Sequence, residues 1–172
     1  TFPSLGKSQP MFVNEIFYAN DDPLKPKSYN WGKRVCVNGN NNGDLMMIQG
    51  IIGLRWKSRV HKYLPSIEAS NIGATDLPSP RRLDYLVKNA LRVHGNSRFL
   101  FIKLHTHGCR ESDFDCLFGE YADKMFDYLE QNYNDGKHYI LHYVTAREMY
   151  NLIKAAEDGH DGNPNKFRNY VI

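Results

Sequence analysis

The second half of this 172-residue chain alternates between strand and helix patterns, and this alternation limits the possible folds more than any other feature of the sequence. Two continuous apolar runs, at residues 99–104 (FLFIKL) and 139–144 (YILHYV), have the length of strands that are buried on both faces. Apolar residues at helical spacing lie before, between and after these runs. Strands joined through helices form right-handed crossovers and parallel sheets, so the pattern predicts an α/β fold.

Start signals place three helices around the two runs. The signals are the Ser79-Pro80 pair, the apolar periodicity that begins at Leu117, and the T-x-x-E capping box of Thr145 and Glu148. In the first half of the chain, residues 12–19 and 44–52 have the composition of strands. We expect these two segments and both apolar runs to belong to one sheet, in which residues 99–104 and 139–144 are parallel.

Length, charge and cysteine content argue against several classes of protein. A chain of 172 residues has the size of one domain, but it is short of the roughly 250 residues of a complete eight-stranded β/α barrel. The formal charge of +3 is too small to indicate a nucleic-acid partner, and the longest apolar runs are far shorter than a membrane span. Three cysteines do not make a disulfide framework, which favours free thiols and a cytoplasmic location.

The most specific chemical feature is the sequence LHTHG at residues 104–108, where a predicted strand leaves the sheet. Parallel β/α folds carry their chemistry at the carboxyl ends of strands. Side chains two residues apart on a strand point to the same side, so we expect the rings of His105 and His107 to lie together. A neutral imidazole can carry a proton near neutral pH or bind zinc. A hydrogen-bonded or solvated histidine without a functional role is the alternative.

Two further interpretations of this pair are weaker. In metal-dependent amidohydrolases an H-x-H pair belongs to the first strand of the barrel, whereas here one clear predicted strand follows the pair. A zinc-binding interaction module would combine both rings with Cys109 and Cys116, but the C-x6-C spacing is wider than in common structural zinc sites. His142, within the last predicted strand, is better explained as a core histidine.

Four other side chains are candidates for binding a substrate. Arg82 carries a guanidinium that can hold a carboxylate or phosphate in a bidentate way, although an ion pair at a solvated helix start is the simpler explanation. Gln49, Tyr18 and Asn14 lie on or at the ends of predicted strands, where they can hydrogen-bond to the hydroxyls of a sugar. The sequence contains neither a glycine-rich phosphate loop nor a nucleophile elbow.

The second half of the chain resembles the C-terminal part of the polysaccharide deacetylases, a family of metal-dependent carbohydrate esterases. Residues 99–108 (FLFIKLHTHG) and 142–149 (HYVTAREM) match a strand that ends in a histidine and the strand one helix later. The wider chain is similar to deacetylase-like proteins of bacterial surface-polysaccharide and O-antigen gene clusters, through the phrases TFPS, NEIFYANDDPLKPKSY, DLMMIQG and PSPRRLD. The resemblance implies a single domain over residues 1–172, a distorted or partial β/α barrel without its N-terminal strands.

The resemblance also implies a chemistry, in which His105 is the catalytic acid toward the leaving amine and His107 contacts the substrate. The implied substrate-binding residues are Arg82, Gln49, Tyr18 and Asn14. The family's T-F-D-D-type and H-x3-H motifs are missing from this sequence. Either the chain is the C-terminal part of a longer protein whose upstream residues hold a divalent metal such as zinc, or it is a metal-less relative. The implied function is metal-dependent hydrolysis of N-acetyl groups on a surface-polysaccharide sugar. The alternative is a non-catalytic sugar-binding or assembly protein on a degenerate deacetylase fold.

Overall fold

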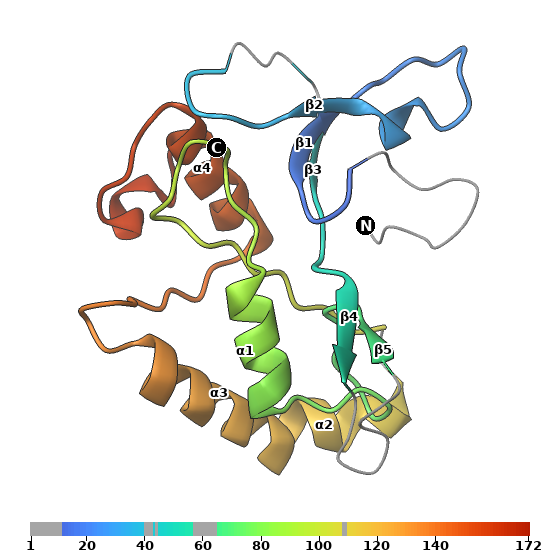
Figure 1. Ribbon diagram of the computed structural model, residues 1–172, viewed down its shortest axis with the longest axis vertical. Helices are drawn as coiled ribbons and strands as arrows, with labels where there is room; N and C mark the ends of the chain where they lie inside the picture. The colour runs from blue at the N-terminus through green and yellow to red at the C-terminus, as the bar shows by residue number, and fades with distance from the viewer. Residues whose placement is uncertain (1–11, 40–42, 44, 57–64, 108–109) are drawn as a thin grey trace. The chain divides into compact units, whose positions relative to one another are not determined.

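The computed structural model describes residues 12–39, 43, 45–56, 65–107 and 110–172 (Figure 1). The chain forms two compact units. The first unit consists of Thr1–Ile51, Ala90–Ile102 and Val144–Ile172, and the second unit consists of Ile52–Asn89 and Lys103–Tyr143. Each unit combines segments that are far apart in the sequence. The prediction of a single domain over residues 1–172 stays a prediction.

The first unit contains a three-stranded antiparallel sheet in which β1 lies between β2 and β3 (Figure 1). The strands are β1 Ile16–Ala19, β2 Gly32–Arg34 and β3 Met46–Ile48. All four residues of β1 are buried, as expected for a central strand that is rich in aromatic and β-branched side chains. Phe17 lies opposite Arg34 on one side and Met47 on the other, which fixes the register. The predicted strand segments 12–19 and 44–52 therefore do contain strands.

The first unit also contains the helix α4 Ala146–Glu157 and the short 3₁₀ helices η1 Ser28–Asn30 and η3 Pro164–Phe167. The predicted capping box at the start of α4 is confirmed. The side chain of Thr145 accepts the N–H of Glu148, and the carboxylate of Glu148 accepts the N–H of Thr145. The helix places its apolar face in the core of the unit through Leu152, Ile153, Ala155 and Ala156.

The second unit pairs β4 Gly53–Trp56 antiparallel with β5 Pro65–Glu68. Its helices are α1 Pro80–Lys88, α2 Phe114–Phe118 and α3 Glu120–Tyr133, with the 3₁₀ helix η2 Glu111–Asp113 leading into α2. Helix α1 begins at the predicted Ser79-Pro80 pair. The helix predicted around Leu117 is divided at Gly119, whose extended backbone separates α2 from α3. Over the described ranges, no helix combines the length and the apolar character that crossing a lipid bilayer requires.

The predicted β/α barrel is wrong. Every ladder between the named strands of the described residues is antiparallel, in one sheet of three strands and one of two, and neither sheet closes. The runs at residues 99–104 and 139–144, which were expected to be parallel neighbours, form no strand. In the first of them, Phe101 makes an isolated antiparallel bridge with Leu91, and in the second, Ile140 is 67% exposed.

Local side chains accept the first backbone N–H group of each of these two runs and the N–H groups just before it. The Asp135 carboxylate accepts three successive backbone N–H groups, at residues 137–139, just where the second run begins. The side chain of Asn96 likewise accepts the N–H groups at residues 98–99, at the start of the first run. Short polar side chains compete in this way with the regular ladders of a sheet. The apolar pattern of both runs is therefore not enough to make them strands.

Candidate functional site

The backbone of His105 is attached to a loop of the second unit. Its N–H donates to the carbonyl of Ser70 at 3.2 Å, and its carbonyl accepts the N–H of Ile72 at 2.8 Å. These two bonds form an isolated parallel bridge between His105 and Asn71. Paired residues of two neighbouring extended segments point their side chains to the same face. The side chains of His105 and Asn71 therefore lie next to each other.

The surroundings of the His105 ring favour its neutral form. Both ring nitrogens are shielded from solvent. Burial first, and then the charges of Lys103 and His107, lower the pKa of His105 below its usual range. The exposed ring of His107 meets the ring of His105 edge to face, with centroids 5.6 Å apart. The two candidate histidines thus lie together in the second unit, and His105 is an imidazole base at neutral pH.

Asn71 supplies an acceptor that no motif or spacing in the sequence indicates. Its Nδ2 donates to Oδ2 of Asp76 at 3.2 Å, and because a carboxylate accepts hydrogen bonds, this contact determines which end of the amide carries the oxygen. Oδ1 of Asn71 is buried and has no hydrogen-bond partner among the residues that the structure describes. An unpaired buried acceptor costs about 1–3 kcal/mol. A ligand with an N–H or O–H group at this position would remove that cost.

Arg82, a candidate for substrate binding, is bound within the protein. Its Nε and one Nη donate to the two carboxylate oxygens of Glu68, at 2.8 and 2.6 Å. The other N–H groups donate to the backbone carbonyls of Asn71, Asp76 and Leu77. All five N–H groups of the guanidinium are thereby used. In this structure Arg82 holds a carboxylate of the protein itself.

Glu68 and Arg82 together hold the loop to which His105 is attached. Burial of Glu68 opposes its ionisation, but the hydrogen bonds and charges of Arg82 and Arg55 outweigh burial and lower the pKa of the Glu68 carboxyl. The same carboxylate accepts the N–H of Ser70 at 3.1 Å, and Ser70 has a left-handed backbone with φ of 57°. A strained backbone persists where its surroundings hold it. The ion pair therefore fixes the conformation of the loop beside His105.

Asp113 is a second buried acid that holds this loop. Its Oδ1 accepts the N–H of Ala74 at 2.9 Å, and its Oδ2 accepts the guanidinium of Arg110 at 3.0 Å. These bonds, and the charge of the nearby His107, lower the pKa of Asp113. Gly73 packs closely against this acid, because a Cβ at position 73 would lie 3.0 Å from Oδ1 of Asp113 and would require that side chain to shift. Two buried acids thus hold this loop: Glu68 accepts the N–H of Ser70, and Asp113 accepts the N–H of Ala74.

Gln49 and Asn14, two of the candidate sugar ligands, lie together in the first unit. Gln49 is almost fully buried; its Oε1 accepts the N–H of Glu15 at 2.9 Å, and its Nε2 donates to the carbonyl of Phe12 at 2.7 Å. Between these two contacts, Asn14 has a left-handed backbone with φ of 58°. Gln49 therefore shapes the turn that presents Asn14, and Asn14 lines a pocket of the first unit.

Tyr18, the fourth candidate, belongs to another cluster of the first unit. Its hydroxyl donates to Oε2 of Glu157 at 2.7 Å and accepts from Nζ of Lys154 at 2.8 Å. Burial is the largest reason why the pKa of Tyr18 rises to about 12. The hydroxyl is thus engaged both as a donor and as an acceptor within the protein. A contact between Tyr18 and a sugar stays a prediction.

The described residues do not fit a metal site. No group of three or more His, Cys, Asp and Glu side chains in those ranges is placed to hold an ion. Cys109, part of the alternative zinc module, lies outside the described residues, and Cys116 is a buried thiol whose pKa is raised by burial. The divalent metal expected upstream stays a prediction.

Comparisons with models of protein families, with curated proteins and with solved structures found no match for this chain. Its function is therefore inferred from its own residues and from the resemblance of its sequence to the polysaccharide deacetylases.

Proposed function

We propose that this chain hydrolyses the N-acetyl group of an amino sugar in a bacterial surface polysaccharide, with His105 as the acid–base residue. The supporting observation is the position of the His105 ring, which is shielded from solvent, has a lowered pKa and lies beside the unused acceptor of Asn71. A neutral imidazole next to an unpaired acceptor is suited to remove one proton and to orient an N–H group. The sequence resemblance points to the same histidine and supplies the class of substrate.

His105 acts twice in the proposed reaction. The neutral ring removes a proton from a water molecule whose oxygen forms a bond to the acetyl carbon. The resulting imidazolium donates that proton to the nitrogen while the C–N bond breaks, and acetic acid and the free amine leave. The lowered pKa of His105 supports the first step, because the base form predominates at neutral pH. It supports the second step as well, because it makes the imidazolium a stronger acid.

Asn71 and His107 position the substrate in this proposal. The acetamido N–H is a donor that Oδ1 of Asn71 can accept, whereas an O-acetyl group offers no such donor. His107 is exposed beside the ring of His105 and contacts the sugar, as the sequence resemblance implies. Arg82 and Glu68 hold the loop and take no part in bond breaking.

The test is the release of acetate from N-acetylated chito-oligosaccharides by the purified chain, with and without added divalent metal ions. His105→Ala should lower kcat/KM by about 10²–10⁴-fold, the usual contribution of a general acid–base residue. His142→Ala is the matched control, because His142 is likewise a partly buried histidine of the second unit. We expect the control to keep the activity of the wild type.

Two results would contradict the proposal. Equal losses in both variants would remove the catalytic role of His105. Saturable binding of the oligosaccharide by the wild type, without release of acetate under any of the metal conditions, would contradict hydrolysis and favour the non-catalytic sugar-binding alternative.

A further inference from the structure

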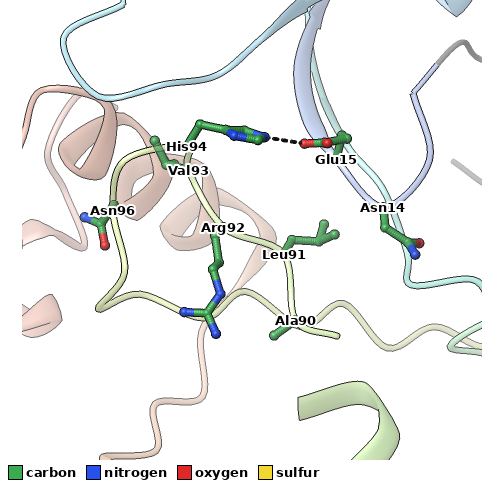
Figure 2. A pocket seen from close by; sticks show the side chains of 8 residues that line it. All are labelled: Asn14, Glu15, Ala90, Leu91, Arg92, Val93, His94 and Asn96. Atoms are coloured by element: carbon green, nitrogen blue, oxygen red, sulfur yellow. Dashed lines mark hydrogen bonds and ion pairs between the residues drawn. The ribbon is translucent and has the colours of Figure 1, made fainter. Parts of the chain in front are cut away.

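The first unit contains an open pocket of about 280 Å³ (Figure 2). Asn14 and Glu15, just before β1, form one side of it, and the extended segment of residues 90–94 forms much of the other. Figure 2 shows the carboxylate of Glu15 directed toward the ring of His94 across this space. The pocket lies within the first unit, whereas the residues proposed for hydrolysis belong to the second.

The turn at Asn14 has the features of a binding turn. A non-glycine residue rarely has a left-handed backbone, and such conformations cluster at ligand sites, where the surrounding structure holds them in place. Here the buried side chain of Gln49 is wholly used to hold the turn, through its bonds to Phe12 and Glu15. Gln49 thus holds the turn from which Asn14 lines the pocket.

Glu15 adds a carboxylate acceptor that already faces two basic side chains. One of its carboxylate oxygens lies 2.9 Å from Nε2 of His94, and the other lies 3.2 Å from Nε of Arg34. A carboxylate has room for about four hydrogen bonds in all. Because two basic groups already face it, Glu15 favours neutral donors such as hydroxyls over a further cation.

Arg92 supplies a cationic group to the pocket. Arg92 is exposed and donates to the carbonyl of Ser97 at 2.9 Å, which leaves the rest of its planar fork for a ligand. A guanidinium is the side chain best suited to hold a carboxylate in a bidentate way. Leu91 and Val93 also line the pocket, with side chains that are almost wholly buried beneath it.

We propose that this pocket binds a ligand of the sugar-acid class, a hydroxyl-rich ring that carries a carboxylate. The hydroxyls bind to Asn14 and Glu15, and the carboxylate binds to Arg92. Each of these groups matches a group that the pocket already presents. The binding does not depend on hydrolysis at His105, so either proposal can fail without the other.

Calorimetric titration of the whole chain with three probes tests this assignment. Glucuronate carries both hydroxyls and a carboxylate, glucose carries hydroxyls alone, and acetate carries a carboxylate alone. We expect glucuronate to bind at least about tenfold more tightly than either of the others, the difference that one charge-assisted contact makes. The His105→Ala variant should bind glucuronate like the wild type.

Three variants locate the binding in the pocket. Arg92→Gln should weaken the binding of glucuronate by about tenfold or more and remove the preference for glucuronate over glucose. Arg98→Gln is the control, because Arg98 is an equally exposed arginine of the same segment that does not line the pocket. Asn14→Gly keeps the left-handed turn but removes the amide, and it should weaken glucuronate and glucose alike.

Absence of saturable glucuronate binding by the wild type would overturn the proposal. Equal binding of glucuronate and glucose would also overturn it, as would equal losses in the Arg92→Gln and Arg98→Gln variants. Thermal unfolding of each variant shows whether a loss of binding comes from a loss of the fold.

Discussion

Arg82 and Glu68 form a bidentate ion pair out of contact with solvent, with Nε–Oε2 and Nη2–Oε1 distances of 2.8 and 2.6 Å. Their side chains are 5% and 0% exposed. The same guanidinium donates to three backbone carbonyls of the loop that contains Asn71. The pair therefore determines where that loop, and with it the unpaired acceptor of Asn71, lies relative to His105.

Breaking this pair should destabilise the protein strongly, because the remaining partner becomes a buried charge without compensation. Removal of one member of a buried pair costs about 3–5 kcal/mol. For Arg82→Met we expect a loss near the lower end of that range, since Arg55 still contacts Glu68 at 2.6 Å. Urea denaturation measures the free energy of unfolding. The exposed neighbour provides the control, and Arg81→Met should change the same quantity by less than about 0.5 kcal/mol.

A double substitution separates the contribution of the ion pair to stability from the contribution of side-chain packing. Replacing both members of the pair, in Arg82→Met with Glu68→Leu, removes the buried carboxylate that Arg82→Met leaves behind and should recover part of the stability lost in Arg82→Met, although Arg55 then loses its contact with Glu68. A double variant that is less stable than Arg82→Met would show that Glu68 holds the loop through Ser70 and Arg55 even without Arg82.

The pH dependence of hydrolysis should report the lowered pKa of His105. The base form of the ring is required, so activity is present above the pKa of His105 and is lost as the pH falls through it. Lys103 is one of the causes of the lowered pKa. Lys103→Met should therefore raise the pKa and move the acid limb of kcat/KM to higher pH. Lys88→Met, at an exposed lysine of α1 in the same unit, should leave the acid limb in place.

Asn71 should matter for activity more than for stability. Its Oδ1 is unpaired in the structure, so Asn71→Leu removes an unsatisfied acceptor together with the single bond from Nδ2 to Asp76. These two changes oppose each other, and we expect the free energy of unfolding to change by less than about 1 kcal/mol. The kcat/KM for N-acetyl substrates should fall about tenfold, by the loss of one hydrogen bond to the substrate. A destabilised variant with unchanged kcat/KM would make Asn71 a purely structural residue.

The helices were predictable because their signals are local. The Ser79-Pro80 pair and the Thr145–Glu148 capping box each specify a helix start within a few residues, and both helices begin there. The sheet was not predictable in this way, since the apolar runs resemble buried strands whatever they pair with. At residues 139–144 the Asp135 carboxylate accepts the N–H groups of the backbone that leads into the run, a competition with strand pairing that hydrophobic periodicity does not report.

The candidate site was likewise predictable only where its signals are local in the sequence. The spacing of His105 and His107 is enough to bring their rings together, and the guanidinium of Arg82 was expected to hold a carboxylate or a phosphate. The carboxylate that Arg82 holds belongs to Glu68, which lies fourteen residues away from Arg82 in the sequence and is brought next to it by the fold. The unused acceptor of Asn71 likewise depends on a pairing with His105 across more than thirty residues, which no short pattern encodes.

The loop after α3 allows the competition between side chains and strands to be measured directly. The Asp135 carboxylate accepts the N–H groups of residues 137–139 and contacts Nδ1 of His138 at 2.8 Å. These contacts favour the charged form, beginning with the N–H of Tyr139, and they lower the pKa of Asp135 well below its usual range. Asp135→Ala removes the acceptor, so the amide hydrogens of residues 137–139 should exchange with solvent faster than in the wild type.

Hydrogen exchange followed by NMR, at a pH where Asp135 is ionised, measures this effect residue by residue. Asp127→Ala is the control, because Asp127 is an exposed aspartate of α3. It should leave the exchange of residues 137–139 unchanged. Asp135→Asn keeps a side-chain oxygen at the same position without the charge, so its exchange rates should lie between those of the wild type and Asp135→Ala. Unchanged rates in Asp135→Ala would mean that the backbone of this loop is held by something other than the Asp135 side chain, and would contradict the role of that side chain in preventing a strand at residues 139–144.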